Sequence, residues 1–424
     1  MKHALLVLTA SACLTISARA DVPLYQVQFL GAGWGASGLN ENGDVCGNGT
    51  VDGSLIRAGV SHDGQPFELL PLPVGMLTSR AYAISDLGVI VGVVCPNQYV
   101  QTQPTAAVWR PISGGGYEVE ILGGLPGDPY SAAWAVNNAG DIIGASGFWG
   151  WNPDHGILYT ESGPEPMPQG LLGADINDQR VVVSGNQLLD LDTGVLTTIP
   201  LPAGNWQGVV SAAINENNDL CGYIAGYSSC SVFPVRYLQA TGWEILGGCS
   251  QSATSATALN DHGDALQYYY QTTDGVNFLG DGYFMLGSLI APGQEYYVQY
   301  GGVAGINNSH QIVASARQGA TGPIGAILMT PDLPASAEPL PSAEEIQVRA
   351  VPNPSFGQIR LEGTSSTLLG GDWMVIDIHG RRQAHFSGRQ WNGRSDDGAR
   401  LPAGVYFLRS AVDAIHPPVQ VILR

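Results

Sequence analysis

The stretch AWAVNNAGDIIG, residues 133–144, decides the fold, because its pattern recurs throughout residues 36–314. Each copy begins with small residues, an aliphatic residue and a position that is usually Asn. Two variable residues follow, then a position that is usually Gly, and then a β-branched run. The Asn position falls at Asn40, Ser85, Asn137, Asn177, Asn215, Asn260 and Asn307. The intervals of 45, 52, 40, 38, 45 and 47 residues are typical of four-stranded propeller blades.

The repeated Asn-x-x-Gly predicts a hairpin turn. Asn hydrogen-bonds the backbone of its own turn, and Gly accepts a positive φ at no steric cost. Arg180, Asn218 and His310 stand where the other copies have Gly, and we expect all three to adopt positive φ, at a greater cost for Arg180 and His310. The small residues before the turn predict an innermost strand that crowds the axis of a ring, where no large side chain fits.

Strands after each hairpin complete the repeat. Apolar third strands such as residues 155–160, HGILYT, are followed by fourth strands such as residues 117–121, YEVEI. The last repeat lacks a fourth strand, whereas LYQVQFLG, residues 24–31, precedes the first hairpin and is similar to one. We therefore predict an all-β, seven-bladed β-propeller closed by its N-terminal strand, which leaves no open sheet edge. Six blades, with one degenerate repeat as an insertion, is the alternative.

The segment LGGLPGDPYSAAWAVNNAGDIIG, residues 122–144, together with HGILYT, resembles the extracellular HAF repeat. The resemblance covers about residues 23–332, and His155 alone keeps the histidine that gives the repeat its name. It implies export and a propeller-like body, without an agreed activity.

Residues 1–20 are typical of a secretory signal peptide. A basic start precedes an apolar run too short to span a bilayer, and Ala18 and Ala20 form a cleavage site. A lipoprotein signal at Cys13 is less favoured, because cleavage there divides the apolar run. We expect a secreted protein or one on the outer cell surface.

Charge divides the remaining chain into two bodies. Residues 21–332 carry 27 acidic residues against 6 arginines, whereas residues 333–424 carry 9 of each. The acidic body argues against nucleic-acid binding, which needs a basic face. A linker rich in Pro, Ala and Ser, residues 333–345, separates the propeller from a C-terminal domain of residues 346–424.

Alternating strands in residues 346–424 predict a small immunoglobulin-like β-sandwich. Val351–Pro354, Gly380–Arg381 and Gly404–Tyr406 resemble the type IX secretion sorting domain, and Trp391–Arg394 resembles the immunoglobulin-like domain of flagellar hook-capping proteins. The resemblance implies a secretion or surface-sorting signal, with outer-membrane secretion machinery as its partner.

Catalytic motifs are absent from the sequence, so we predict no catalytic residue and no cofactor. The spacing of cysteines and histidines does not match a metal site either. Cys230 and Cys249 share one repeat and form the favoured disulfide, since five cysteines outside the leader cannot all pair.

His62, His262 and His310 are interpreted as solvated turn residues, and His155 as a packing or capping residue. Asp190 and Asp192 are placed on one face of a strand, as ordinary carboxylates rather than calcium ligands.

Aromatic residues in the connections between strands are the better indication of function. Trp34, Trp149, Trp151, Trp206 and Tyr297 are candidate ligand-binding residues, because flat rings beside polar side chains suit sugars. Packing between blades is the alternative for each ring. The favoured function is a non-enzymatic binding propeller with an extracellular glycan or surface polymer as its partner. The alternative is a polysaccharide-active enzyme, a glycosidase or lyase, that uses carboxylates at the axial funnel.

Overall fold

The structure is a computed structural model. The residues that it describes are 23–98, 103–147, 155–167, 171–227, 232–247, 254–269, 274–299, 302–332, 348–351, 355, 357–363, 372–377, 382–396, 398–410 and 419–423. Within these ranges, no helix has the length and apolar character needed to cross a membrane. The chain divides into two compact units between Asp332 and Leu333.

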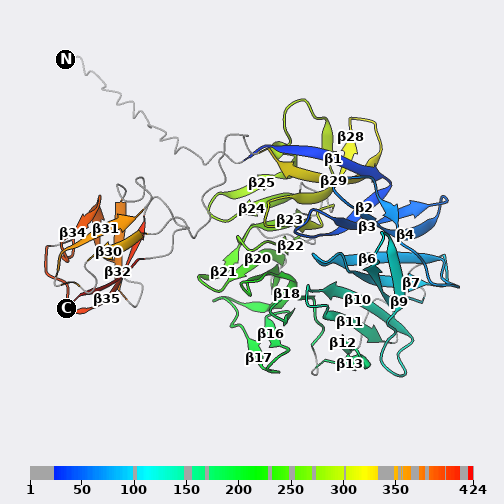
Figure 1. The fold of residues 1–424 in the computed structure, drawn as a ribbon, viewed down its shortest axis with the longest axis horizontal. Helices are drawn as coiled ribbons and strands as arrows, with labels where there is room; N and C mark the ends of the chain where they lie inside the picture. The colour runs from blue at the N-terminus through cyan, green and yellow to red at the C-terminus, as the bar shows by residue number, and fades with distance from the viewer. Residues whose placement is uncertain are drawn as a thin grey trace, which may run out of the picture. The chain divides into compact units, whose positions relative to one another are not determined.

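Seven antiparallel sheets follow one another around the first unit, so it is a seven-bladed β-propeller (Figure 1). The six-bladed alternative is therefore wrong. Blades 1 to 3 consist of β2 (Trp34–Leu39), β3 (Val45–Val51), β4 (Leu55–Ser61) and β5 (Glu68–Leu69); β6 (Thr78–Ile84), β7 (Ile90–Cys95), β8 (Thr105–Pro111) and β9 (Tyr117–Ile121); and β10 (Tyr130–Val136), β11 (Ile142–Gly147), β12 (His155–Thr160) and β13 (Gly163–Pro166). Blades 4 to 6 consist of β14 (Asp175–Ile176), β15 (Val181–Ser184), β16 (Gln187–Asp190) and β17 (Leu196–Thr198); β18 (Trp206–Ile214), β19 (Leu220–Gly226), β20 (Val232–Leu238) and β21 (Gly242–Ile245); and β22 (Thr254–Leu259), β23 (Ala265–Tyr269), β24 (Gly275–Phe278) and β25 (Gly282–Met285).

The seventh blade is made from both ends of the unit. Its members are β26 (Tyr296–Val298), β27 (Gly305–Ile306), β28 (Ile312–Gln318), β29 (Ile324–Pro331) and β1 (Tyr25–Ala32), and the one-turn helix α1 (Leu286–Leu289) precedes β26. β1 pairs antiparallel with β29, from Tyr25 opposite Pro331 to Ala32 opposite Gly325 (Figure 1). The first strand of the unit thus occupies the outer edge of the last blade.

A β-bulge recurs in the innermost strand of five blades. The ladder skips one residue shortly before the Asn turn, such as Tyr82 in β6 and Trp134 in β10. The Gly that ends the repeat lies beside the bulge, where a backbone carbonyl of the inner strand comes very close. A Cβ at Gly92 or Gly144 would lie 1.9 or 2.0 Å from that oxygen, so no larger residue fits there. Four of the five bulged blades have Gly at this position, whereas blade 6 has Gln267 there. The bulge therefore favours Gly without requiring it.

Hydrophobic cores lie between neighbouring blades. Between blades 1 and 2, for example, Val60 and Cys46 pack with Ile90 and the fully buried Trp109. The Trp109 indole N–H donates to the Pro71 carbonyl at 2.8 Å, so its burial leaves no polar atom unpaired. Each blade therefore depends on its neighbours for a closed core.

The second unit contains two antiparallel sheets around one core. One sheet has the order β30 (Val348–Val351), β31 (Ile359–Gly363), β34 (Gln390–Trp391); the other has the order β33 (Arg382–Ser387), β32 (Asp372–Asp377), β35 (Gly404–Ser410), β36 (Val419–Leu423). Buried side chains of both sheets, including Leu361, Trp373, Trp391 and Leu408, form this core. The expected signal peptide, residues 1–20, and the linker, residues 333–345, lie outside the described residues.

Deletion of residues 24–31 tests the role of β1. Without it, the hydrogen-bonding edge of β29 is open to solvent and to other chains, so we expect aggregation or loss of cooperative thermal unfolding. Light scattering and calorimetry measure both. Deletion of residues 346–424, which belong to the other compact unit, is the control and should leave unfolding of the propeller unchanged. A residue 24–31 deletion as stable as the parent would exclude a closing role for β1.

Candidate functional site

The turn asparagines link the blades around the axis. Six of the seven turn positions carry Asn, and each Asn donates a side-chain amide hydrogen to the backbone carbonyl at the same turn position of the next blade, at 2.9–3.2 Å. We call these seven positions the turn ring: Asn40, Ser85, Asn137, Asn177, Asn215, Asn260 and Asn307. Only the step from Ser85 to Asn137 lacks the bond, because serine carries no amide.

Each turn-ring side chain also fixes its own turn. The Asn oxygen accepts the N–H of the residue four positions later. For example, Asn40 accepts from the Asp44 N–H at 2.8 Å, and Asn177 accepts from the Val181 N–H at 2.9 Å. Ser85 keeps this second role, since its hydroxyl accepts the Val89 N–H at 3.3 Å. The Asn of the repeat is therefore used twice, for the hairpin and for the neighbouring blade.

The residues that follow the turn ring form a second, complete circle. In every blade the backbone N–H of this residue donates to a side-chain oxygen of the equivalent residue in the next blade, at 2.7–3.1 Å. We call these residues the acidic rim: Glu41, Asp86, Asn138, Asp178, Glu216, Asp261 and Asn308. Asn138 also bridges Asp86 and Asp178, and Asn308 binds Asp261, each with its side-chain amide at 2.7 Å.

Two of the five carboxylates of the acidic rim, Glu41 and Glu216, have a raised pKa. Burial, with the nearby charges of Asp178 and Asp261, raises the pKa of Glu216 above its usual value, although backbone hydrogen bonds oppose the shift. Burial also raises the pKa of Glu41, together with Asp86 and Asp261, against the hydrogen bond from Asn308. The rim is therefore a ring of negative charge held together by the backbone amides of neighbouring blades.

A cavity of about 300 Å³ lies within the rim. Its walls are rim and turn-ring side chains, and its aliphatic residues come from the position just before each turn. We call these the aliphatic layer: Leu39, Ile84, Val136, Ile176, Ile214, Leu259 and Ile306. The cavity thus presents oxygen and amide groups around an apolar floor.

A second cavity of about 250 Å³ shares the aliphatic layer except Ile176 and extends along the innermost strands. The bulge residues line it, and two of these are Tyr82 and Trp134, so the expectation that no large side chain fits near the axis is wrong. The bulge explains the difference, because it turns the skipped side chain out of the ladder. Asp175 also lines this cavity, and burial raises its pKa to about 6, even though the Ile176 and Ile214 N–H groups donate to it.

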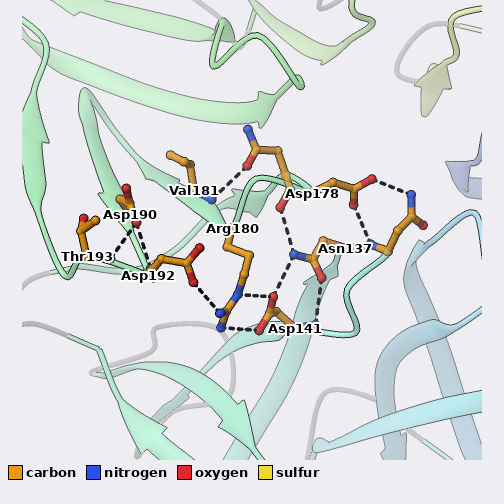
Figure 2. Close-up of polar contacts among 10 residues, drawn as sticks. Asn137, Asp141, Asp178, Arg180, Val181, Asp190, Asp192 and Thr193 are labelled. Carbon is orange, nitrogen blue, oxygen red and sulfur yellow. Dashed lines mark hydrogen bonds and ion pairs between the residues drawn. The ribbon is translucent and has the colours of Figure 1, made fainter.

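The three residues that replace Gly in the turns adopt positive φ, as predicted: 62° for Arg180, 61° for Asn218 and 57° for His310. Their side chains reach the preceding blade. Arg180 donates two hydrogen bonds to Asp141, both at 2.9 Å, and one to Asp192 (Figure 2). Backbone strain on the order of 1–3 kcal/mol is thus accepted where a long side chain gains a contact between blades.

The turn histidines are not simply solvated. His310 pairs with Asp264 of the preceding turn at 3.1 Å, and His62 pairs with Asp44 at 2.9 Å. His155 pairs with the Asp128 carboxylate at 2.9 Å, and its side chain is 53% exposed.

Asp190 and Asp192 do not share a strand face, because β16 ends at Asp190 and Asp192 lies in the following turn. Asp190 accepts the backbone N–H groups of Asp192 and Thr193, and Asp192 pairs with Arg180 (Figure 2).

Three of the predicted aromatic residues, Trp34, Trp206 and Tyr297, lie in the described part of the chain. Trp34 and Trp206 begin the innermost strands of blades 1 and 5, at the opposite end of each strand from the turn ring. Trp34 stacks on Phe67 with ring centroids 4.5 Å apart, and Trp206 packs edge-on against Phe233 at 5.4 Å. Tyr297, in β26, is exposed. Trp149 and Trp151, like Cys230 and Cys249, lie outside the described residues, and ligand binding by these aromatic residues stays a prediction.

The sequence reasoning missed the acidic rim, although its residues directly follow the repeated Asn. The signal was present as an acid or Asn at all seven positions after the turn ring. Its arrangement around one cavity required the ring geometry.

The first unit is a seven-bladed β-propeller with a polar axial cavity. Neither a family model nor a curated protein matches the sequence. Among solved structures, virginiamycin B lyase from Staphylococcus aureus is 14% identical, covering 72% of this chain and 99% of that one, with a TM-score of 0.44. PorZ, a surface component of the type IX secretion system of Porphyromonas gingivalis, is 12% identical, covering 91% and 74%, with a TM-score of 0.30. The SapL1 lectin, solved with alpha methyl fucoside, is 13% identical, covering 73% and 99%, with a TM-score of 0.32.

Glu216→Gln tests the electrostatics of the rim, because Gln keeps an oxygen for the Asp178 N–H and removes the charge. A carboxyl whose pKa is raised on folding contributes stability below its unfolded pKa and loses it as the pH rises through the folded pKa. The variant should therefore melt about 1–3 °C above the parent near pH 7, and the difference should vanish near pH 4. Glu118→Gln, on an exposed position of β9, controls for net charge. A variant less stable than the parent at pH 7 contradicts this account.

Proposed function

We propose that the chain is an exported or cell-surface, non-enzymatic binding propeller whose axial cavity binds carbohydrate. The observation that carries the proposal is the acidic rim around an apolar floor. Five carboxylates and two amides supply many hydrogen-bond acceptors and few donors, and they match a ligand rich in hydroxyl groups. The aliphatic layer matches the apolar face of a sugar ring.

Binding is favoured over catalysis because each rim carboxylate already holds a backbone amide of the neighbouring blade. Glu41 accepts from Asn308, and Glu216 accepts from Asp178. A general acid or nucleophile must change its charge or its bonds during a reaction, which would disturb this ring. The polysaccharide-active enzyme remains the second candidate, and the raised pKa values of Glu41 and Glu216 favour it.

A glycan array with the protein lacking residues 346–424 tests the binding function. The double variant Glu41→Gln/Glu216→Gln keeps oxygens for the rim amides, removes two charged acceptors, and should weaken binding of the hits about tenfold or more. Glu68→Gln/Glu118→Gln, at exposed strand positions, is the matched control. Equal affinity of the parent and the rim variant contradicts the axial site. Turnover of a bound glycan that the rim variant loses would favour the enzyme.

A second variant in the same assay tests whether the glycan binds at Trp206 instead of in the axial cavity. If Trp206→Ala weakens glycan binding without lowering the melting temperature, the ligand lies at the other end of the strands. If Trp206 is a packing residue, its truncation should instead cost on the order of 3–5 kcal/mol of folding stability.

We further propose that the C-terminal unit is an immunoglobulin-like sandwich that acts as a secretion and surface-sorting signal. The two sheets around one core support a separately folded module, and the sequence resemblance to sorting domains supports the role. In a host with type IX secretion, protein lacking residues 346–424 should stay in the periplasm. Normal surface display or release of this truncation contradicts the sorting role.

A further inference from the structure

A second cluster of side chains lies apart from the axial cavity, between the turns of blades 6 and 7. It contains His262 and Asp264 from the sixth turn and His310 from the seventh. The ligand atoms of all three lie within 4.8 Å of one another. We propose that these three side chains bind a divalent transition metal of the zinc class.

The donor set fits such a metal. Two imidazoles and one carboxylate favour zinc, cobalt or nickel over calcium or magnesium, which prefer oxygen ligands. Three protein ligands leave a coordination position open for water or an external ligand. His262 is exposed and the His310 side chain is 37% exposed, so an ion reaches the cluster from solvent.

Asp264 is held in place as an oriented ligand. Its side chain is 5% exposed, and it accepts hydrogen bonds from the Leu279 N–H at 2.8 Å and from the Asn260 amide at 3.1 Å. Its ion pair within the described residues is with His310. Partners of this kind fix the direction in which a carboxylate presents its remaining lone pairs to a metal.

His310 is placed toward this cluster at a conformational cost. It has φ 57° at a position where Gly43, Gly88, Gly140 and Gly263 stand in other turns. Its ring stacks on that of His262, with centroids 4.8 Å apart and an angle of 26° between the planes. Two stacked imidazoles repel each other when both are protonated, whereas a shared metal binds both in the neutral form.

The equivalent site between blades 3 and 4 is a useful contrast. There the positive-φ residue is Arg180, which neutralises Asp141 with two hydrogen bonds. Arginine cannot bind a metal, but histidine at the same position can. The sequence alone could not reveal the site, because His310 belongs to a different repeat from His262 and Asp264.

Titration of the untagged full chain with Zn²⁺ by calorimetry, and with Co²⁺ by visible absorption, tests the proposal. We expect saturable binding at one site, visible bands typical of cobalt bound by nitrogen and oxygen, and a higher melting temperature with Zn²⁺. His262→Ala and His310→Gly should each weaken binding by more than the roughly 10–100-fold that loss of an outer partner costs.

His310→Gly separates loss of a ligand from loss of the fold, because glycine adopts the same positive φ freely. Its metal-free form should unfold as cooperatively as the parent, because relief of the backbone strain offsets loss of the pair with Asp264. His62→Ala and His155→Ala remove histidines from two other His–Asp pairs and should leave binding unchanged. The proposal is overturned if the parent shows no saturable binding, or if His262→Ala and His310→Gly bind the metal as the parent does.

Discussion

The hydrogen bond from a turn asparagine to the backbone of the next blade is the interaction on which the propeller depends. A blade alone leaves its faces unburied, and hydrophobic packing between blades does not fix their number or register. The directional bonds of the turn ring fix the number and register of the blades at the axis, where a side-chain amide links six of the seven pairs of neighbouring blades. The acidic rim repeats the connection one residue later and completes it in all seven blades.

This arrangement explains why the surface around the axial cavity is polar and acidic. The rim carboxylates remain close together because backbone N–H groups stabilise them. These bonds oppose the burial and the repulsion that raise the pKa of Glu216. The same side chains therefore close the ring and line the axial cavity. Where a blade departs from the repeat, as at Arg180 and His310, the new side chain forms a contact across the boundary between blades.

The repeat period and the Asn-x-x-Gly turns were sufficient to predict seven blades, because both are local patterns. Six blades have the expected four strands, and the seventh has five. They also predicted positive φ at Arg180, Asn218 and His310. The position of Tyr82 and Trp134 in the wall of the second cavity could not be predicted, because a bulge decides which way each side chain points. The rim and the His262–Asp264–His310 cluster could not be predicted either, since each combines residues from different repeats whose proximity exists only in the closed ring.

The interruption of the turn ring at Ser85 allows a direct test. Ser85→Asn retains an acceptor for the Val89 N–H and adds a donor for the Asn137 carbonyl, and Ser85 borders the axial cavity, where there is room for a larger side chain. Asn177→Ser makes the reverse change and removes the bond to the Asn215 carbonyl. Calorimetry should show that Ser85→Asn melts about 2–4 °C higher than the parent and that Asn177→Ser melts lower by a similar amount or more. If neither substitution changes the melting temperature, the turn ring does not hold the blades together.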